Sequence, residues 1–219
     1  ASRDARRQGS FRLSCVVPAY NEAALIGRFL PALVETARNL TPDVEIIVVD
    51  DGSSDGTGAI VDALTQTLPL RHIRLSRNFG KESALTAGLD ATRGDVVVLM
   101  DADGQHPVEL VERMLGLWRE GHDVVYAVRR TREDQSRLHA GLTSAFYRLI
   151  NWGSRVEIPP HAGDFRLMDR QVVEALKALP ERNRFMKGLY AWVGFRTEFI
   201  RYTPAPRAAG TPATRHTTA

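Results

Sequence analysis

The sequence predicts an α/β fold with a mostly parallel central sheet flanked by helices. Short apolar runs, typical of buried strands, alternate with segments of helical periodicity, which is the pattern of β-α-β units. Acidic residues follow two of the apolar runs, where open α/β sheets bind their ligands. A chain of 219 residues, 43% of them apolar, is long enough for one domain or for one domain with an appendage.

The alternation is clearest up to residue 128. The run 44–49 is continuous and β-branched, as expected for a strand buried on both faces. Pro18 closes the first strand, and Asn21 is a candidate cap for a helix that Pro42 follows. Strands are expected at 13–17, 44–49, 70–75, 95–100 and 123–128, and helices at about 22–39, 57–67, 81–91 and 108–119.

The pattern changes in the rest of the chain. Residues 136–151 predict a helix with one apolar face, either a core-facing helix or an interfacial membrane helix. A short strand at 165–168 and a helix at 171–179 follow. Residues 1–12 form a polar, basic and flexible arm, and the tail 203–219 shows no periodicity and is expected to be unstructured. These limits leave 13–202 as the folded domain.

Charge is unevenly distributed along the chain. Residues 13–128 carry 9 Lys and Arg against 17 Asp and Glu, whereas residues 129–207 carry 15 against 8. The first part therefore suits a cation, and the second suits phosphates or an anionic surface. Cys15 is the one cysteine and is expected in the core. No disulfide can form within the chain, which fits a reducing compartment. We see no apolar run of 18 residues and no secretory signal peptide.

Two carboxylates, Asp101 and Asp103, follow the apolar run 96–100. Gln105 offers a neutral oxygen to the same cation. This oxygen set suits Mg²⁺ or Mn²⁺ and is poor for zinc, which usually takes nitrogen or sulfur ligands. It leaves coordination positions for phosphate oxygens and water, so the stretch predicts a metal-bound diphosphate.

The turns after the first two strands carry further candidates. The first turn has no G-x-G-x-x-G and the chain has no P-loop, which argues against a nicotinamide enzyme and a P-loop nucleotidase. Tyr20 can stack on a base, and Glu22 can hold base or ribose donors. In the second turn Asp50 and Asp51 end a buried strand, and Gly52 permits close approach of backbone. The candidate caps for the next helix are Ser53, Ser54 and Asp55.

Several motifs occur in order along the chain. They are PAYNE at 18–22, DDGSSDGT at 50–57, RNFGKESAL at 77–85, DADGQHP at 101–107, RRTREDQSRL at 129–138, AGDFRLMDR at 162–170 and ERNRFMKGLYAWVGF at 181–195. The first four resemble the family 2 glycosyltransferases with the GT-A fold. The last three narrow the resemblance to the polyprenyl-phosphate sugar transferases, which include dolichyl-phosphate mannose synthase and bacterial polyprenyl-phosphate glucosyltransferases.

The resemblance implies roles at the matching positions and makes 13–202 the GT-A catalytic domain. Donor-binding positions are Pro18, Ala19, Tyr20, Glu22, Asp50, Gly52 and Lys81. Metal and diphosphate would lie at Asp101, Ala102, Asp103 and Gln105. Arg129 and Arg137 would meet the sugar diphosphate or the acceptor phosphate, and Arg207 would contact the lipid phosphate. Asp164 would face the acceptor and the transferred sugar, so the catalytic set is Asp103, Asp164, Arg129 and Arg137.

The implied reaction is an inverting, metal-dependent transfer of a hexose from a nucleotide sugar to a polyprenyl phosphate. It would take place at the cytoplasmic face of a membrane, in cell-envelope glycan synthesis. UDP-glucose is favoured over a GDP-linked sugar. The attacking phosphate is already largely dianionic near neutral pH, so Asp164 is expected to orient it more than to accept a proton. Many members also carry C-terminal transmembrane helices, which this sequence lacks.

Other readings stay open. A family 2 enzyme acting on a saccharide or protein hydroxyl would need a carboxylate base. A non-catalytic nucleotide-sugar binder is a further alternative, although the acidic pair and the arginines of the second half are all present. A nucleic-acid partner is not expected, because no recognised binding motif occurs. A membrane surface is an expected partner, and a homo-oligomer is left open.

Overall fold

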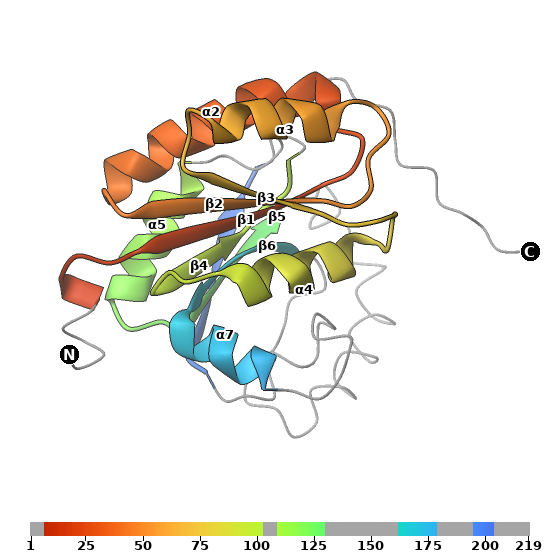
Figure 1. The fold of residues 1–219 in the computed structure, drawn as a ribbon. Coiled ribbons are helices and arrows are strands. Elements are labelled where there is room, and N and C mark those ends of the chain that lie inside the picture. The colour runs from red at the N-terminus through yellow and green to blue at the C-terminus, as the bar shows by residue number, and fades with distance from the viewer. Residues whose placement is uncertain (1–6, 103–108, 130–161, 179–194, 204–219) are drawn as a thin grey trace, which may run out of the picture.

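The structure is a computed structural model that describes residues 7–102, 109–129, 162–178 and 195–203 (Figure 1). In these residues one sheet has the strand order β3-β2-β1-β4-β6-β5-β7. The strands are β1 Leu13–Ala19, β2 Val44–Asp50, β3 Leu70–Arg74, β4 Val96–Leu99, β5 Val124–Arg129, β6 Ala162–Asp169 and β7 Thr197–Tyr202. The helices are α2 Ala23–Leu40, α3 Thr57–Thr65, α4 Lys81–Ala91, α5 Leu110–Arg119 and α7 Arg170–Lys177.

The sheet is mixed but mostly parallel. β1 pairs in parallel with both β2 and β4, β2 pairs in parallel with β3, and β5 pairs in parallel with β7. Among the described strands only β6 runs antiparallel, between β4 and β5. The predicted fold class, a mostly parallel α/β sheet with flanking helices, is confirmed.

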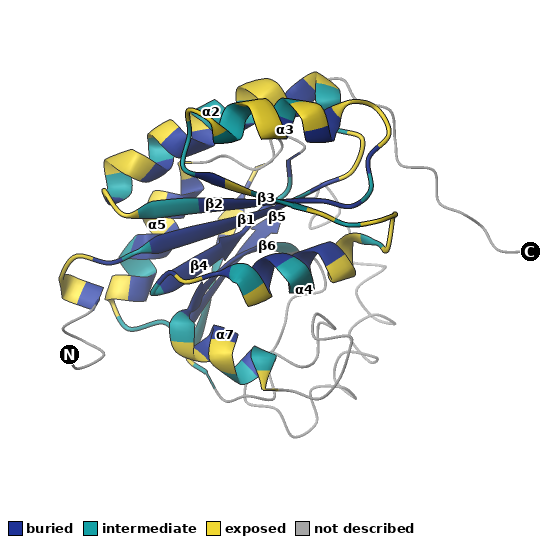
Figure 2. Ribbon diagram, in the orientation of Figure 1, coloured by how far each residue is buried: buried dark blue, intermediate teal, exposed yellow. Residues whose placement is uncertain are grey.

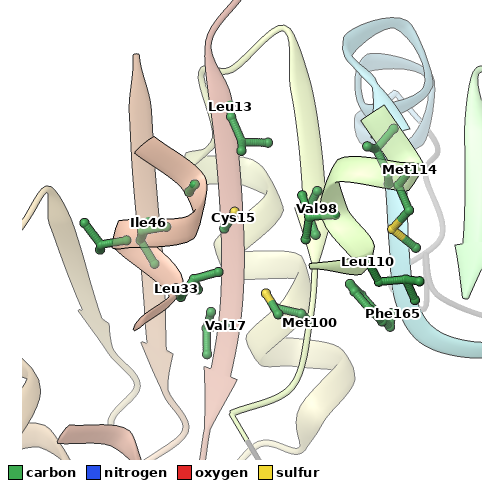
Figure 3. Packing of buried hydrophobic residues seen from close by; sticks show 14 of the residues in the cluster. Leu13, Cys15, Val17, Leu33, Ile46, Val98, Met100, Leu110, Met114 and Phe165 are labelled. Carbon is green, nitrogen blue, oxygen red and sulfur yellow. The ribbon is translucent and has the colours of Figure 1, made fainter. Parts of the chain in front are cut away.

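Helices cover both faces of the sheet. α2 and α3 lie on one side of it and α4 and α7 on the other (Figure 1). Along β1 the side chains alternate. Cys15 and Val17 pack in the cluster that includes α2 and α5 (Figure 3), and Val16 packs on the other face with α4. The exposed residues lie mainly on the outer surfaces of the helices (Figure 2). Among the described helices none is both long and apolar enough to cross a bilayer.

Cys15 lies in this core, as the sequence predicts. Its side chain is fully buried beneath α2. Burial, with a smaller contribution from the charge of Glu45, raises the pKa of the thiol to about 12. A buried thiol with so high a pKa is unreactive at neutral pH, because the thiolate is the nucleophilic form.

Two strands differ from the sequence expectations. β1 continues through Pro18 and pairs it with Val49. The proline is tolerated because β4 pairs with β1 only as far as Val16, so no ladder bond to β4 is lost there. β6 is longer than the expected strand 165–168, since it pairs along both of its edges.

One further strand, β7, was not expected at all. It lies at the edge of the sheet, where a strand needs no continuous apolar run. The helix expected over 136–151 lies outside the described residues, as does the tail from 204 onward.

The N-terminal segment packs more closely than a flexible arm would. Arg7 is buried, with its Nη2 2.6 Å from Asp123 Oδ1 and 3.1 Å from Asp169 Oδ2. Its Nη1 donates to the carbonyl oxygen of Trp118 at 2.9 Å, and the ring of Phe11 packs against the same tryptophan. The expected loose arm over 1–12 is therefore wrong for these two residues, because two buried carboxylates require a cation beside them.

Replacing Arg7 by Met should lower the free energy of unfolding by about 3–5 kcal/mol, because it leaves two buried carboxylates without their cation. Urea denaturation measures the loss. Arg12→Met is the matched control, since the ion pair of Arg12 with Asp43 is exposed and such pairs contribute little. Equal losses in the two variants would contradict the structural role of Arg7.

Gly88 allows α4 to approach the sheet closely. A Cβ at this position would collide with Cγ1 of Val16 on β1. Gly88→Ala should therefore destabilise the protein by about 1–3 kcal/mol through overpacking. Gly116→Ala on α5 is the control, because a Cβ there meets nothing within 4 Å and should stabilise the helix by up to about 1 kcal/mol. Thermal or urea unfolding distinguishes the two, and a stabilised Gly88→Ala would refute the close approach.

Candidate functional site

The carboxyl ends of β1, β2 and β4 lie at the same edge of the sheet, because the three strands are parallel neighbours. β6 runs in the opposite direction, so its amino-terminal end lies at this edge. Arg166 pairs with Leu99, the last residue of β4, so Asp164, two residues before Arg166, lies beside Asp101, two residues after Leu99. The antiparallel pairing thus brings together two carboxylates that are distant in the sequence.

Lys81 joins these two carboxylates. Its Nζ lies 2.6 Å from Asp101 Oδ1 and 2.8 Å from Asp164 Oδ2. All three side chains are partly exposed, so the bridge lies at the surface of the sheet edge. Lys81 is the first residue of α4, and the bridge therefore connects α4, β4 and β6.

The charge state of Lys81 follows from two opposing effects. Burial lowers its pKa, but the charges of Asp101 and Asp164 and their hydrogen bonds raise it, and the net shift is upward. Because a lysine ordinarily titrates near pH 10.4, the side chain is a cation at neutral pH.

Arg166 holds Asp164 from the interior side. Its Nη2 lies 3.1 Å from Asp164 Oδ1, and its guanidinium packs over the ring of Tyr126. Arg166 itself is almost fully buried. Each carboxylate oxygen of Asp164 therefore faces a cation, Arg166 on one side and Lys81 on the other.

The turns that follow β1 and β2 are hydrogen-bonded to each other. The backbone N–H of Asn21 donates to Ser53 Oγ at 3.0 Å, and Asn21 Oδ1 accepts from the backbone N–H of Ser54 at 3.0 Å. Asn21 has a positive φ of 55°, which asparagine tolerates better than most residues. The expected cap role of Asn21 is therefore wrong, since the cap position of α2 is Glu22 and Asn21 binds the neighbouring turn.

Asp55 ties the starts of two helices together. Its Oδ1 accepts from the backbone N–H and the hydroxyl of Thr57, and its Oδ2 accepts from the backbone N–H of Ala23. Gly56, with a φ of 94°, occupies the cap position of α3. Asp55, a candidate cap from the sequence, therefore binds the start of α3 from the position before the cap residue Gly56.

Asp51 and Gly52 hold the loop that leads into α4. Asp51 is buried and accepts from the backbone N–H groups of Phe79 and Gly80, at 2.8 and 2.9 Å. Gly52 has a φ of 72°, and a Cβ there would lie 2.5 Å from the carbonyl carbon of Arg77. This loop ends at Lys81, so the acidic turn helps to place the lysine.

Asp50 lies beneath the turn rather than on its surface. Its carboxylate is fully buried, and its Oδ1 accepts from the backbone N–H of Ser53 at 2.8 Å. Its Oδ2 lies 3.7 Å from Arg74 Nε and 4.0 Å from His72 Nε2 and makes no hydrogen bond. In this arrangement Asp50 supports the turn from below.

Two aromatic rings are exposed near these turns. Tyr20 is 43% exposed and Phe79 is 47% exposed, and they are the exposed large hydrophobic side chains in the described part of the chain. The guanidinium of Arg77 lies over the ring of Phe79, 4.2 Å from its centroid. Tyr20 thus presents a ring to solvent at the carboxyl end of β1, as stacking on a base would require.

The remaining sequence candidates divide into two groups. Pro18 and Ala19 lie in β1, Glu22 occupies the cap position before α2, Arg129 ends β5, and Ala102 is buried directly after Asp101. Asp103, Gln105, Arg137 and Arg207 lie outside the described residues. Sequence reasoning missed the roles of Asn21, Asp51 and Arg166. The signal for Arg166 was present as a charged residue inside the apolar run 165–168.

The described residues include one of the three predicted metal ligands, Asp101. Asp101 offers carboxylate oxygens at the exposed edge, and its Oδ1 already faces the positive charge of Lys81. Oxygen ligands are those that Mg²⁺ and Mn²⁺ prefer. Within the described residues no three His, Cys, Asp or Glu side chains form a cluster that could hold a metal, and the other two predicted ligands, Asp103 and Gln105, lie outside them.

A family model described as "Glycosyl transferase family 2" matches residues 14–177. The chain belongs to this family. The resemblance drawn from the motifs is confirmed, and the enzyme class it predicts, glycosyltransferase, is the class of the family.

Similar proteins in the family include two from bacteria or their phages. The chain is 45% identical to an uncharacterised glycosyltransferase of Synechocystis sp. and 44% identical to a bactoprenol glucosyl transferase of Shigella phage SfX. The matches cover 92% and 91% of this chain but 64% and 66% of those proteins. The chain therefore spans slightly less than two thirds of the length of these relatives.

Solved structures of glycosyltransferases share the fold. A mannosyltransferase from Pyrobaculum calidifontis, solved with GDP-Man and Mn²⁺, matches with a TM-score of 0.64 at 22% identity, over 93% of this chain and 59% of that one. Glucosyl-3-phosphoglycerate synthase from Mycobacterium tuberculosis, solved with Mn²⁺, UDP and phosphoglyceric acid, matches with a TM-score of 0.65 at 22% identity, over 95% of this chain and 74% of that one. At this identity the likeness shows the GT-A fold of the family 2 domain.

Gly52→Ala should disrupt the packing of the loop 77–80 against the acidic turn. The new Cβ would require both a strained positive φ and displacement of the Arg77 backbone. Gly56→Ala is the matched control, because Gly56 also has a positive φ but a Cβ there meets open space. The unfolding midpoint should fall clearly further for Gly52→Ala than for Gly56→Ala. Equal midpoints would mean that the close approach at Gly52 is unimportant.

Proposed function

We propose that this domain transfers glucose from UDP-glucose to a polyprenyl phosphate with inversion at the anomeric carbon. The observation that carries the proposal is the 44% identity to a bactoprenol glucosyl transferase over 91% of the chain. The bridge between Lys81, Asp101 and Asp164 at the edge of the sheet supports it, because it gathers the charged groups that such a transfer needs.

The donor nucleotide would bind over the turns after β1 and β2. Tyr20 supplies an exposed ring for the base, and Glu22 follows it at the start of α2. We assign Asp50 and Gly52 to the support and shape of this surface, since Asp50 is buried beneath it. A GDP-linked sugar is the alternative donor, and the solved neighbours include one complex with GDP-Man and one with UDP.

Asp101, with Asp103 and Gln105, would hold Mg²⁺ or Mn²⁺ and the donor diphosphate. A bound divalent cation neutralises charge that develops on the leaving diphosphate. The neighbours solved with Mn²⁺ are consistent with a divalent metal. Lys81, which directly follows the loop held by Asp51, adds a further positive charge on the same side of the site.

The acceptor phosphate would be bound by Arg129, Arg137 and Arg207 through forked hydrogen bonds. It requires positioning more than deprotonation, because a phosphate monoester is largely dianionic near neutral pH. Asp164 fits an orienting role, since both of its oxygens are engaged by cations, Arg166 and Lys81. The lipid tail of the acceptor would place the domain at a membrane surface.

The second candidate is transfer to a saccharide or protein hydroxyl. A hydroxyl must lose its proton during attack, which requires a carboxylate general base. By the family resemblance, Asp164 is the described carboxylate that would face the acceptor. Its ion pairs with Lys81 and Arg166 disfavour a role as general base, because they stabilise the unprotonated carboxylate. The excess of arginine in residues 129–207 also favours a phosphate acceptor.

The test is product analysis with the full chain, Mn²⁺ and labelled UDP-glucose. Offered polyprenyl phosphate together with oligosaccharides, the enzyme should label the lipid phosphate, and NMR should show inverted configuration at the anomeric carbon. Asp101→Asn should lower the rate at least about a hundredfold, because losing even an outer partner of a metal ligand costs 10–100-fold. Asp43→Asn, an exposed carboxylate before β2, should leave the rate unchanged. Label found only on saccharide would overturn the proposal.

A further inference from the structure

Lys81 occupies an unusual place for a basic residue. It is the first residue of α4, and its cap position is a glycine that provides no side-chain cap. The N-terminus of a helix carries partial positive charge and favours anions. A lysine is therefore disfavoured there by the helix itself, and the two carboxylates that it contacts must outweigh this cost.

The ammonium group faces the oxygen that a metal would use. Nζ of Lys81 lies 2.6 Å from Asp101 Oδ1, and Asp101 is the described member of the predicted metal set. Two cations beside one carboxylate repel each other strongly when the surroundings are only partly solvated. Lys81 and a divalent cation therefore compete for Asp101 as long as no further anion is present.

The two carboxylates differ in what remains if Lys81 moves away. Asp164 keeps its contact with the buried Arg166 at 3.1 Å. Among the described residues, Asp101 has no comparable second cation beside it, so it becomes available to a metal. The Lys81 side chain is 41% exposed and has a flexible stem, whereas α4 is fixed against the sheet at Gly88. The side chain can therefore move without the helix.

We propose that Lys81 is an internal competitor of the divalent cation at Asp101, which makes the metal bind weakly alone and tightly together with a nucleoside diphosphate. The diphosphate supplies the anionic oxygens that accept the ammonium, so its arrival removes the competitor. This inference rests on the metal and donor sites of the proposed function. The competition by Lys81 couples the two ligands, so bound diphosphate raises the affinity for the metal. By linkage, bound metal raises the affinity for the diphosphate by the same factor.

The test measures Mn²⁺ binding to the full chain by titration calorimetry or by the EPR signal of free Mn²⁺, with and without UDP. Lys81→Met should bind Mn²⁺ alone roughly tenfold more tightly than the unmodified chain, within the usual range of coupling between two sites. The gain in Mn²⁺ affinity that UDP brings should shrink by a similar factor. Lys81→Gln, which keeps a polar group but no charge, should behave in the same way if Lys81→Met folds poorly.

Lys177→Met is the control for removing a lysine. Lys177 contacts Glu174 on α7 and lies outside the bridge, so its loss should leave both Mn²⁺ affinities unchanged. The proposed competition is wrong if neither Lys81 variant binds Mn²⁺ alone more tightly than the unmodified chain, although Asp101→Asn abolishes Mn²⁺ binding. In that case the metal site of the proposed function stands. If Asp101→Asn leaves Mn²⁺ binding unchanged, the proposed metal site is itself wrong and the competition falls with it.

Discussion

An ammonium group shared by two carboxylates is the interaction on which the rest of the site depends. Lys81 contributes it from α4, Asp101 receives it at the end of β4, and Asp164 receives it on β6. The antiparallel insertion of β6 beside β4 is what makes the meeting geometrically available. Without that reversal of direction, the two acidic side chains would end up at opposite edges of the sheet.

The donor side is built by a different means, through backbone hydrogen bonds accepted by side chains. Asp51 fixes the loop before α4, Asp55 joins the starts of α2 and α3, and Asn21 locks the first turn to the second. The hydrogen bonds of these acidic and amide side chains therefore hold the surface in shape. In the described part of the chain, the groups left to meet a ligand are the exposed ring of Tyr20 and the charged bridge of Lys81, Asp101 and Asp164.

Local patterns predicted the elements that are governed by local rules. The helix 81–91 was expected with the bounds that α4 has, and the buried strand 44–49 lies within β2. Pairing between distant segments decided what was missed. Pro18 stays in β1 because of where β4 stops, β7 exists because β5 offers it an edge, and Arg7 is drawn inward by Asp123 and Asp169. The motifs identified both Asp101 and Asp164 as candidates. Their proximity could not be predicted locally, because it depends on the pairing of β4 with β6.

The burial of Cys15 has a practical consequence for experiments on this domain. The sequence has no other cysteine, and this one is sealed beneath α2 with its thiol held protonated. Residues 1–219 therefore offer maleimide dyes and nitroxide spin labels no accessible cysteine. A single cysteine introduced on an exposed loop would be derivatised selectively, so distances and motions around the sheet edge can be followed by fluorescence or EPR without first removing the natural residue.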